Sequence, residues 1–285
     1  MIGVSNNQYA KPFIKWAGGK RQLLPQIKER IPAALKGTYY EPFVGAGALF
    51  FELQRNKAVI NDLNSELIDT YISIKENVDE LIELLQEYTA KNKPNYFYET
   101  RSKDRDESYR SWSRVEKAAR FIYLNKTCYN GLYRVSAQGF FNTPFGNYKN
   151  PAICEEIKLR AINNYLNTSD VKICNGDYEK SIKIAKEGDF IYFDPPYHSP
   201  DKTNFTGYQK GGFDENDQER LYIIFSKLSD KGVKCMLSNS STSFINNLYK
   251  DFNIDPVKAT RAINSISSER GAVEEVIVRN WWSDD

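Results

Sequence analysis

The sequence predicts an α/β fold with a mostly parallel sheet and a helical and hairpin insert around residues 66–165. Strand-like apolar runs alternate with helix-like segments before and after this insert. A glycine-rich turn at residues 41–48 joins a strand to a helix, as is common in α/β proteins. Residues 125–151 have no long period and are rich in Asn, Gly, Tyr and Phe, which indicates a hairpin and loops with Gln138-Gly139 as a candidate turn.

The expected strands lie on both sides of the insert. They are residues 38–40, 58–62, 171–174, 190–193, 233–238 and 273–278. Within the insert, leucines and isoleucines at helical spacing over residues 67–85 predict an amphipathic stretch, which residues 91–94 end with a proline. Ser113 and Glu116 have the spacing of a capping box and predict the start of another helix.

The composition, 41% hydrophobic and 14% aromatic, excludes a disordered chain, and no apolar run approaches the ~20 residues that cross a bilayer. We therefore expect no membrane partner. The N-terminal residues contain no basic region followed by an apolar segment. We therefore expect that the chain has no signal peptide and is cytoplasmic. Four scattered cysteines without a C-x-x-C pair and a single histidine, His198, offer few zinc ligands, so no metal is expected.

Residues 91–134 carry eleven Lys/Arg against five Asp/Glu, interleaved with aromatic residues. This combination suits a polyanion with stackable faces, namely nucleic acid. A solvated helical surface with ordinary lysines explains it equally well.

Two glycines in the turn at residues 41–48, Gly45 and Gly47, permit close approach of a ligand to the backbone before a helix N-terminus. Asp62 ends the next expected strand, where an α/β sheet often places an acid against a ribose. Together they indicate a cofactor that contains adenosine. Tight packing for the glycines, and a helix cap for Asp62, are the structural alternatives.

The stretch Ala17-Gly18-Gly19-Lys20 is not a P-loop, because Arg21 stands where a magnesium-binding Ser or Thr is needed. Trp16 and Lys20 still combine an aromatic plane with a cation, which suits a purine or the charged tail of a cofactor. The alternative is that Trp16 belongs to the core.

Asp194-Pro195-Pro196-Tyr197 follows the apolar run 190–193. An exocyclic amine of a nucleobase is a poor nucleophile, because its lone pair is delocalised into the ring. Two rigid acceptors, the Asp194 carboxylate and the Pro195 carbonyl, favour a pyramidal nitrogen, while Tyr197 offers a ring on which an extruded base can stack. A turn with a packing tyrosine is the alternative.

Several segments in this order resemble one family: "FIKWAGGK", "EPFVGAGALFFEL", "INDLN", "YNGLYRV", "FNTPFGNYKNP" and "YFDPPY". The chain is similar over nearly its whole length to the Dam family of S-adenosylmethionine-dependent DNA adenine-N6 methyltransferases, and most of all to its DpnM-type modification enzymes. The resemblance implies the fold of S-adenosylmethionine-dependent methyltransferases, a mostly parallel mixed sheet flanked by helices. Residues 1–65 and 166–285 would form the catalytic domain, and residues 66–165 a helical and hairpin DNA-recognition insert.

The resemblance also implies site residues. Asp194, Pro195 and Tyr197 match the catalytic motif. The positions that match cofactor-binding residues are Trp16, Lys20, Glu41, Pro42, Phe43, Gly45, Gly47, Asp62, Asp177 and Asp194. The cofactor is S-adenosyl-L-methionine, the product is S-adenosyl-L-homocysteine, and the methyl group goes to N6 of adenine without a metal. Loop 199–213 either closes over the flipped base or is a passive surface loop.

The implied partner is double-stranded DNA that contains GATC. The matching DNA-contact residues are Lys15, Tyr129, Asn130, Leu132, Arg134, Pro144 and Tyr148. Lys15 matches the residue that reads the first guanine, and the planar fork of Arg134 fits O6 and N7 of a guanine. The enzyme would either modify DNA beside a restriction endonuclease or act alone, and the sequence leaves both open. The alternatives are a methylase of cytosine N4 or of single-stranded DNA, and a catalytically silent DNA-binding relative.

Overall fold

The computed structural model describes residues 9–16, 18–200, 212–260 and 272–282. The chain forms two compact units. The first unit comprises Met1–Gly19, Gly45–Asn56 and Asn61–Gly176, and the second comprises Lys20–Val44, Lys57–Ile60 and Asp177–Asp285. The chain thus passes between the units several times, and the boundaries of the recognition insert at residues 66 and 165 stay a prediction.

Seven strands in the described part of the chain form one sheet in the order β3-β2-β1-β4-β5-β7-β6. Their bounds are β1 (Tyr39–Glu41), β2 (Lys57–Asp62), β3 (Asp170–Asn175), β4 (Phe190–Phe193), β5 (Lys234–Ser240), β6 (Asn253–Thr260) and β7 (Ala272–Arg279). β1 pairs in parallel with β2 and β4, β4 pairs in parallel with β5, and β7 runs antiparallel to β5 and β6. The predicted mixed, mostly parallel sheet is confirmed.

The sequence did not predict β6. Pro256 lies inside it, and a proline argues against a central strand because it cannot donate to the ladder. The strand is tolerated because β6 lies at the edge of the sheet and pairs only with β7.

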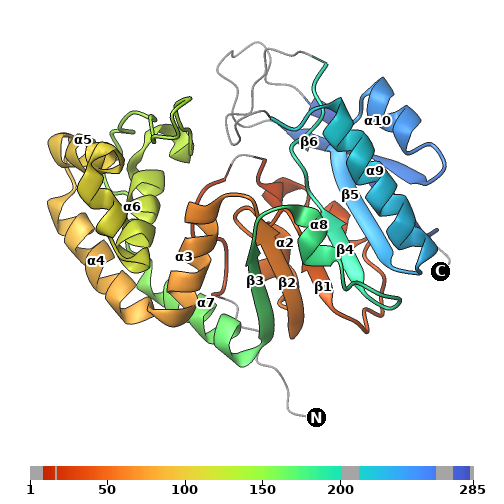
Figure 1. The fold of residues 1–285 in the computed structure, drawn as a ribbon, viewed down its shortest axis with the longest axis horizontal. Helices are drawn as coiled ribbons and strands as arrows, with labels where there is room; N and C mark the ends of the chain where they lie inside the picture. The colour runs from red at the N-terminus through yellow and green to blue at the C-terminus, as the bar shows by residue number, and fades with distance from the viewer. Residues whose placement is uncertain (1–8, 17, 201–211, 261–271, 283–285) are drawn as a thin grey trace. The chain divides into compact units, whose positions relative to one another are not determined.

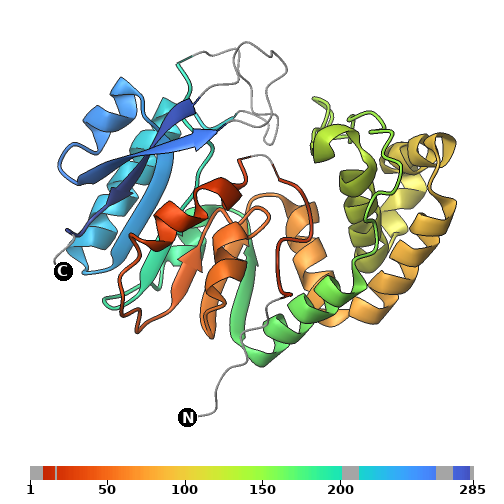
Figure 2. The ribbon, with the colours of Figure 1, turned by 180° about the vertical axis from the view of Figure 1, so that it is seen from behind.

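In the second unit, short and long helices accompany the strands. They are α1 (Leu24–Lys28), α8 (Tyr178–Ile182), α9 (Glu215–Asp230) and α10 (Ser243–Leu248). α9 begins at a reciprocal capping box of Asp214 and Asp217 and packs against β5. Figure 1 shows α8 and α9 in front of the strands, whereas α1, in red, lies in front of them in the reverse view of Figure 2. β4 is buried along its whole length, as expected for a parallel strand covered on both faces.

In the first unit, a group of helices surrounds an aromatic core. They are α2 (Ala48–Leu53), α3 (Ser65–Glu76), α4 (Val78–Lys91), α5 (Pro94–Ser102), α6 (Arg114–Thr127) and α7 (Glu156–Thr168). The expected amphipathic stretch at residues 67–85 is two helices, because the backbone leaves helical geometry at Asn77. The capping box at Ser113 and Glu116 is confirmed as the start of α6.

The hairpin, residues 127–146, is an irregular antiparallel pair. Backbone amides of Gly146, Tyr129 and Asn142 bond to carbonyls of the opposite arm at 2.8, 2.8 and 2.9 Å. The expected turn closes where the Gly139 amide donates to the Ser136 carbonyl at 2.8 Å. Between the bonded stretches, Asn130 has a φ of 55°, which interrupts the ladder.

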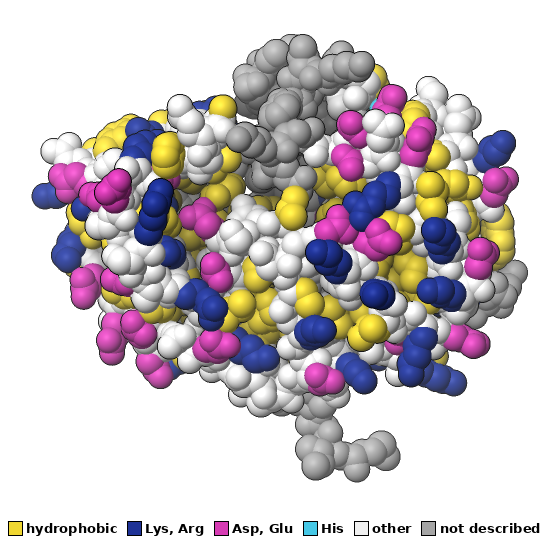
Figure 3. Space-filling view, viewed as in Figure 1, with side chains coloured by type: hydrophobic (Ala, Val, Ile, Leu, Met, Phe, Trp, Pro, Cys, Tyr) yellow, Lys and Arg dark blue, Asp and Glu magenta, His cyan; other side chains and the backbone are white. Residues whose placement is uncertain are grey.

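Part of the charge of the basic segment 91–134 is paired within the fold. Five of its eleven cations form ion pairs within the protein: Lys91, Arg105, Arg114, Arg120 and Lys126. Two of its aromatic residues, Phe97 and Tyr123, are fully buried. On the face in Figure 3 basic and acidic side chains are intermixed.

None of the helices in the described ranges has the length and apolar character that would take it across a membrane.

Arg120 joins α6 to the segment after α5 and is only 2% exposed. It pairs with Asp104 at 2.9 Å and donates to the carbonyls of Thr100 and Arg101 at 2.9 and 2.8 Å. We expect Arg120→Met to lower the free energy of unfolding by about 2–4 kcal/mol, because three buried hydrogen bonds of a charged group are lost, although Asp104 keeps its pair with Arg105.

Urea denaturation measures this loss. The matched control is Arg114→Met, which breaks half-exposed ion pairs with Asp69 and Glu76 and should cost less than about 1 kcal/mol. Equal losses for the two variants would contradict the assignment of Arg120 to the core.

Candidate active site

The carboxylate of Asp194 stands directly after β4 and is held by two neighbours. Lys20 Nζ lies 2.9 Å from Asp194 Oδ1, and Ser238 of β5 donates to the same oxygen at 3.0 Å. Burial raises the pKa of Asp194, against the opposing effects of Lys20 and the Ser238 hydrogen bond. Both partners meet Oδ1, so Oδ2 is the oxygen available to an incoming hydrogen-bond donor.

The proline pair has two carbonyls, and among the described residues a donor meets only one of them. Gln218 of α9, which is fully buried, donates to the Pro196 carbonyl at 3.0 Å. Asn239 Nδ2 donates to Gln218 Oε1 at 3.0 Å, while Asn239 Oδ1 accepts the His198 amide at 2.9 Å. Among the described residues, no donor meets the Pro195 carbonyl. The corner therefore presents one carboxylate oxygen and one rigid carbonyl.

Tyr197 is fixed at both ends of its side chain. Lys20 Nζ lies 4.3 Å from the ring centroid, and the hydroxyl donates to Glu275 of β7 at 2.9 Å. Burial, followed by the charge of Asp194, raises the pKa of Tyr197 well above its usual value. The hydroxyl is therefore protonated at neutral pH and donates to the Glu275 carboxylate.

Ser238, Gln218, Asn239 and Glu275 support this corner, and the sequence reasoning missed all four. The available signal was a run of polar residues, Ser238-Asn239-Ser240, at the end of an apolar strand. Glu275 could not be found in this way, because its position depends on the register of β7. The strand was predicted, but its pairing of Glu275 with Ser240 was not.

Glu41 ends β1, which runs parallel and adjacent to β4. It is 3% exposed and accepts a hydrogen bond from Tyr39. The strand order reverses between β1 and β4, and ligands of open α/β sheets bind beyond the carboxyl ends of strands at such a switch point. Glu41 and Asp194 are the acidic residues at this position.

Phe43 begins an aromatic cluster in the second unit. Its ring centroid lies 4.9 Å from that of Tyr178 and 5.9 Å from that of Phe213. Asp177 caps α8 and binds Arg220 through both oxygens at 2.8 Å, which holds the pKa of Asp177 below its usual value. Arg220 also lies over the Tyr178 ring. The sequence reasoning did not single out Arg220, the cation that orients Asp177.

Asp62 belongs to the first unit and holds the glycine turn. One oxygen accepts the Gly45 amide at 3.0 Å and the other accepts the Asn64 amide at 2.9 Å. Burial raises the pKa of this carboxyl although these amides oppose the shift. The alternative that Asp62 caps the next helix is wrong, because Asn64 is the N-cap of α3 and its side chain accepts the Leu67 amide.

The glycines of the turn are required by packing. Gly45 and Gly47 have φ values of 49° and 73°. A Cβ on Gly45 would lie 2.8 Å from Trp16, and one on Gly47 would lie 2.7 Å from the Tyr71 hydroxyl. Trp16 itself is half-buried and stacks on Tyr133 with centroids 5.4 Å apart. The packing alternative thus accounts for both glycines, while Trp16 keeps part of its surface exposed.

The expected DNA-contact residues of the hairpin are exposed or half-exposed. They are Tyr129, Asn130, Leu132, Arg134, Pro144 and Tyr148. Arg134 donates through Nε to Asn142 Oδ1 at 2.8 Å. This bond does not use the two terminal nitrogens of the guanidinium. Lys15 lies in the same unit, with Nζ 5.3 Å from the Tyr148 ring centroid. The structure therefore brings Lys15 and the hairpin together.

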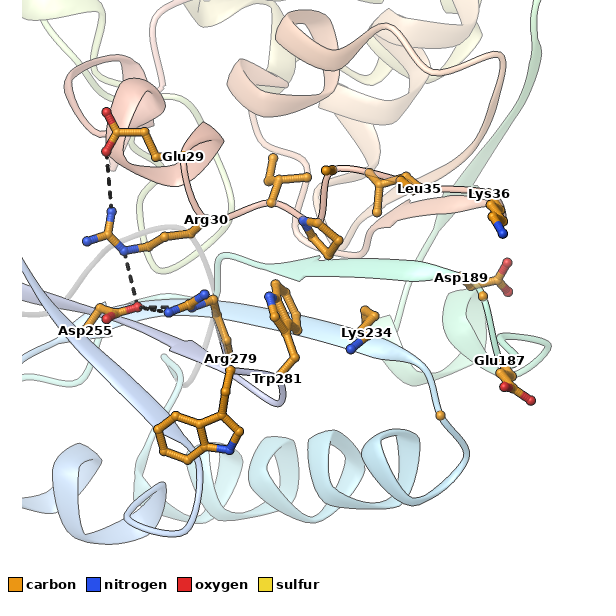
Figure 4. A pocket seen from close by; sticks show the side chains of 17 residues that line it. Glu29, Arg30, Leu35, Lys36, Glu187, Asp189, Lys234, Asp255, Arg279 and Trp281 are labelled. Atoms are coloured by element: carbon orange, nitrogen blue, oxygen red, sulfur yellow. Dashed lines mark hydrogen bonds and ion pairs between the residues drawn. The ribbon is translucent and has the colours of Figure 1, made fainter. Parts of the chain in front are cut away.

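A groove of about 830 Å³ in the second unit lies away from Asp194. Gly188 and Asp189, before β4, and Lys234, at the start of β5, line it, whereas Asp194 follows the end of β4 (Figure 4). Its central charges are paired with one another, because Asp255 binds both Arg30 and Arg279 at 3.2 and 2.7 Å. The groove therefore lies at the end of β4 that is opposite to Asp194.

Within the described ranges, His, Cys, Asp and Glu side chains form no group placed to hold a metal ion, and all four cysteines are free. Residues 201–211, most of the expected lid loop, lie outside the described part of the chain.

Comparison with known proteins defines the class of this site. Residues 16–263 match the family model of the D12 class N6 adenine-specific DNA methyltransferases. The chain belongs to this family. It is an adenine-specific DNA methyltransferase, with DNA as its substrate, and family membership implies S-adenosylmethionine as the methyl donor.

Relatives cover nearly the whole chain. The type II methyltransferase M1.LlaDCHI of Lactococcus lactis subsp. cremoris is 49% identical over 95% of this chain and 95% of its own length. The type II methyltransferase M.MjaIII of Methanocaldococcus jannaschii is 42% identical over 95% of this chain and 99% of its own. The DNA adenine methylase of Escherichia coli K12 is 33% identical over 94% of each chain.

The pair Lys20–Asp194 predicts a pH dependence. The Asp194 carboxylate must be ionised to accept a proton, and its pKa is already raised by burial. Lys20→Met removes the cation that favours the ionised form, so the pKa rises further and the acid limb of kcat moves to higher pH. The measurement is kcat against pH with both substrates saturating.

Lys20→Arg retains the charge and serves as the control, with an acid limb close to that of the wild type. An unchanged limb in Lys20→Met, or one that moves to lower pH, would contradict a role of Asp194 as the titrating acceptor.

Proposed function

We propose that this chain transfers the methyl group of S-adenosylmethionine to N6 of the adenine in GATC within double-stranded DNA. The observation that carries this proposal is the corner after β4, where Asp194 Oδ2 and the Pro195 carbonyl remain available while the neighbouring groups are bonded. Two acceptors side by side match the two hydrogens of an exocyclic amine. The corner suits an amino group better than a hydroxyl, which has one hydrogen.

Asp194 and Pro195 act on the attacking nitrogen. Each accepts a hydrogen bond from one of the two N6 hydrogens. These two bonds draw the amine out of the plane of the base and direct its lone pair away from the ring. The acceptors need no reorganisation, since prolines fix the backbone and Lys20 and Ser238 hold the carboxylate. A raised pKa makes Asp194 a stronger acceptor for the proton that N6 releases.

Tyr197 supplies the surface for an extruded adenine. Its hydroxyl is tied to Glu275, so the ring cannot rotate freely when the base arrives. Extraction of the base costs a few kcal/mol of stacking and pairing, and stacking on Tyr197 offsets part of this cost.

The residues proposed for cofactor binding fit S-adenosylmethionine. When bound, the cofactor supplies a methyl group on a positively charged sulfur and leaves as S-adenosyl-L-homocysteine. Half-buried Asp62 keeps unused lone pairs for ribose hydroxyls, although both of its oxygens hold backbone amides. Glu41 and Lys20 offer a carboxylate and an ammonium to the amino-acid end of the cofactor, and Phe43 offers an apolar face to the purine.

The sequence preference rests on the hairpin and on Lys15. Arg134 presents two terminal N–H groups in a planar fork, which matches the O6 and N7 acceptors of guanine. Exposed Tyr129 and Tyr148 add aromatic surface beside it. These positions match the family residues that read GATC. Two relatives named type II methyltransferases support a modification role beside a restriction endonuclease.

The decisive experiment combines labelled S-adenosylmethionine with duplexes that differ only at GATC. We expect label in N6-methyladenine of the GATC duplex after digestion to nucleosides. Label in cytosine, or equal label in single strands and in duplexes without GATC, would refute the proposed substrate.

In the same assay, Asp194→Asn should lower kcat by at least roughly 10²–10³-fold, because the charged acceptor is lost while the shape is kept. Binding of S-adenosylmethionine and DNA, measured by calorimetry, should fall far less. Parallel losses of folding and binding would make Asp194 a structural residue.

Arg134→Ala should relax discrimination at one base pair by about 1–3 kcal/mol, because a bidentate contact to one guanine is lost. The measurement is kcat/KM on GATC and on duplexes with one substituted pair. The control is Lys149→Ala, an exposed cation near the hairpin, which should leave discrimination unchanged. A uniform loss on all sequences would identify Arg134 as a phosphate contact.

A further inference from the structure

Asn125, near the end of α6, is a buried polar residue to which no role has been assigned above. Its side chain is 1% exposed. Asn125 Oδ1 accepts the backbone amide of Lys15 at 2.9 Å, and Nδ2 donates to the Lys15 carbonyl at 2.8 Å and to the Gly131 carbonyl at 3.0 Å. Both amide hydrogens and the amide oxygen are therefore used, and one side chain ties together α6, the N-terminal segment and the hairpin.

The contact between Lys15 and the hairpin is also close. Gly131 has a φ of 65°, and a Cβ there would lie 2.6 Å from Cδ and 2.8 Å from Cβ of Lys15. The stem of Lys15 thus packs directly on the hairpin backbone. At its far end, the ammonium lies near the Tyr148 ring of the other hairpin arm. The backbone and stem of Lys15 are thus held against the hairpin, although Lys15 is far from it in sequence.

These contacts fix the Lys15 backbone relative to the hairpin. The amide of Asn125 bonds both the N–H and the C=O of one residue, as a neighbouring strand would do, so a shift of Lys15 breaks two buried hydrogen bonds at once. Residues that read separate base pairs must keep a constant spacing, because small displacements break bidentate contacts to base edges.

We propose that Asn125 is a specificity-positioning residue that makes Lys15 and the hairpin read the target as one unit. This inference rests on the proposed recognition of GATC by Lys15 and Arg134. Asn125 touches neither DNA nor cofactor and acts through the residues it holds. Its loss should therefore change which sequences are methylated more than how fast the cognate sequence is methylated.

The experiment measures kcat/KM for duplexes with GATC, with a substituted first base pair, and with a substitution at the pair that Arg134 reads. We expect Asn125→Ala to lower discrimination at both pairs by roughly ten-fold, the factor typical of one weakened base contact. Lys15→Ala should lower discrimination at the first pair alone. In the Lys15→Ala background, Asn125→Ala should add nothing at the first pair, since the two residues act through one contact.

Asn163→Ala is the matched control. Asn163 Nδ2 also donates to two backbone carbonyls, those of Ile74 and Lys75, at 2.9 Å, but joins α7 to the end of α3. Its loss should lower stability and leave both discrimination ratios unchanged. If Asn125→Ala does not fold, Gly131→Ala tests the same contact, because its methyl group pushes against the Lys15 stem and should lower discrimination at the first pair.

Loss of activity in the same proportion on all duplexes, with unchanged ratios, would reduce Asn125 to a folding residue and overturn the inference. A wild-type enzyme that does not prefer GATC would instead overturn the proposed function. The two failures are therefore distinguishable.

Discussion

The structure of the candidate active site depends on a carboxylate placed where water does not solvate it fully. Asp194 directly follows the end of the buried strand β4, and burial alone would favour its protonated form. Lys20 and Ser238 counter this by bonding one oxygen, which fixes the plane of the carboxylate. A charged group held in a buried corner interacts strongly with a nearby amine, because little solvent screens it.

The proline corner shows how a protein prepares acceptors before a substrate arrives. Each proline removes an amide donor, so the adjoining carbonyls lose their usual partners. Gln218 satisfies the Pro196 carbonyl, and Asn239 orders the backbone that follows at His198. Among the described residues the Pro195 carbonyl alone of this proline pair lacks a donor, and we assign it to the amino group of the base. The surrounding polar shell is thus as important as the motif that it supports.

In the proposed recognition of DNA, buried contacts matter more than surface charge. Many cations of the basic segment pair with acids of the same unit, so its composition overstated the charge offered to DNA. Arg134, tied through Nε to Asn142, and Lys15, tied through its backbone to Asn125, keep their ends exposed. Fixed positions matter here because base edges are distinguished by the geometry of donors and acceptors.

The sequence by itself determined the strands of the parallel sheet, the start of α6 and the acidic strand ends, because apolar runs, caps and proline corners are local signals. It also carried the family motifs. Only the tertiary structure decided that Asn64, not Asp62, caps α3, that Glu275 meets Tyr197, and that Asn125 holds Lys15. Such contacts join residues far apart in sequence, and no local pattern records which distant backbone group a buried amide or carboxylate will satisfy.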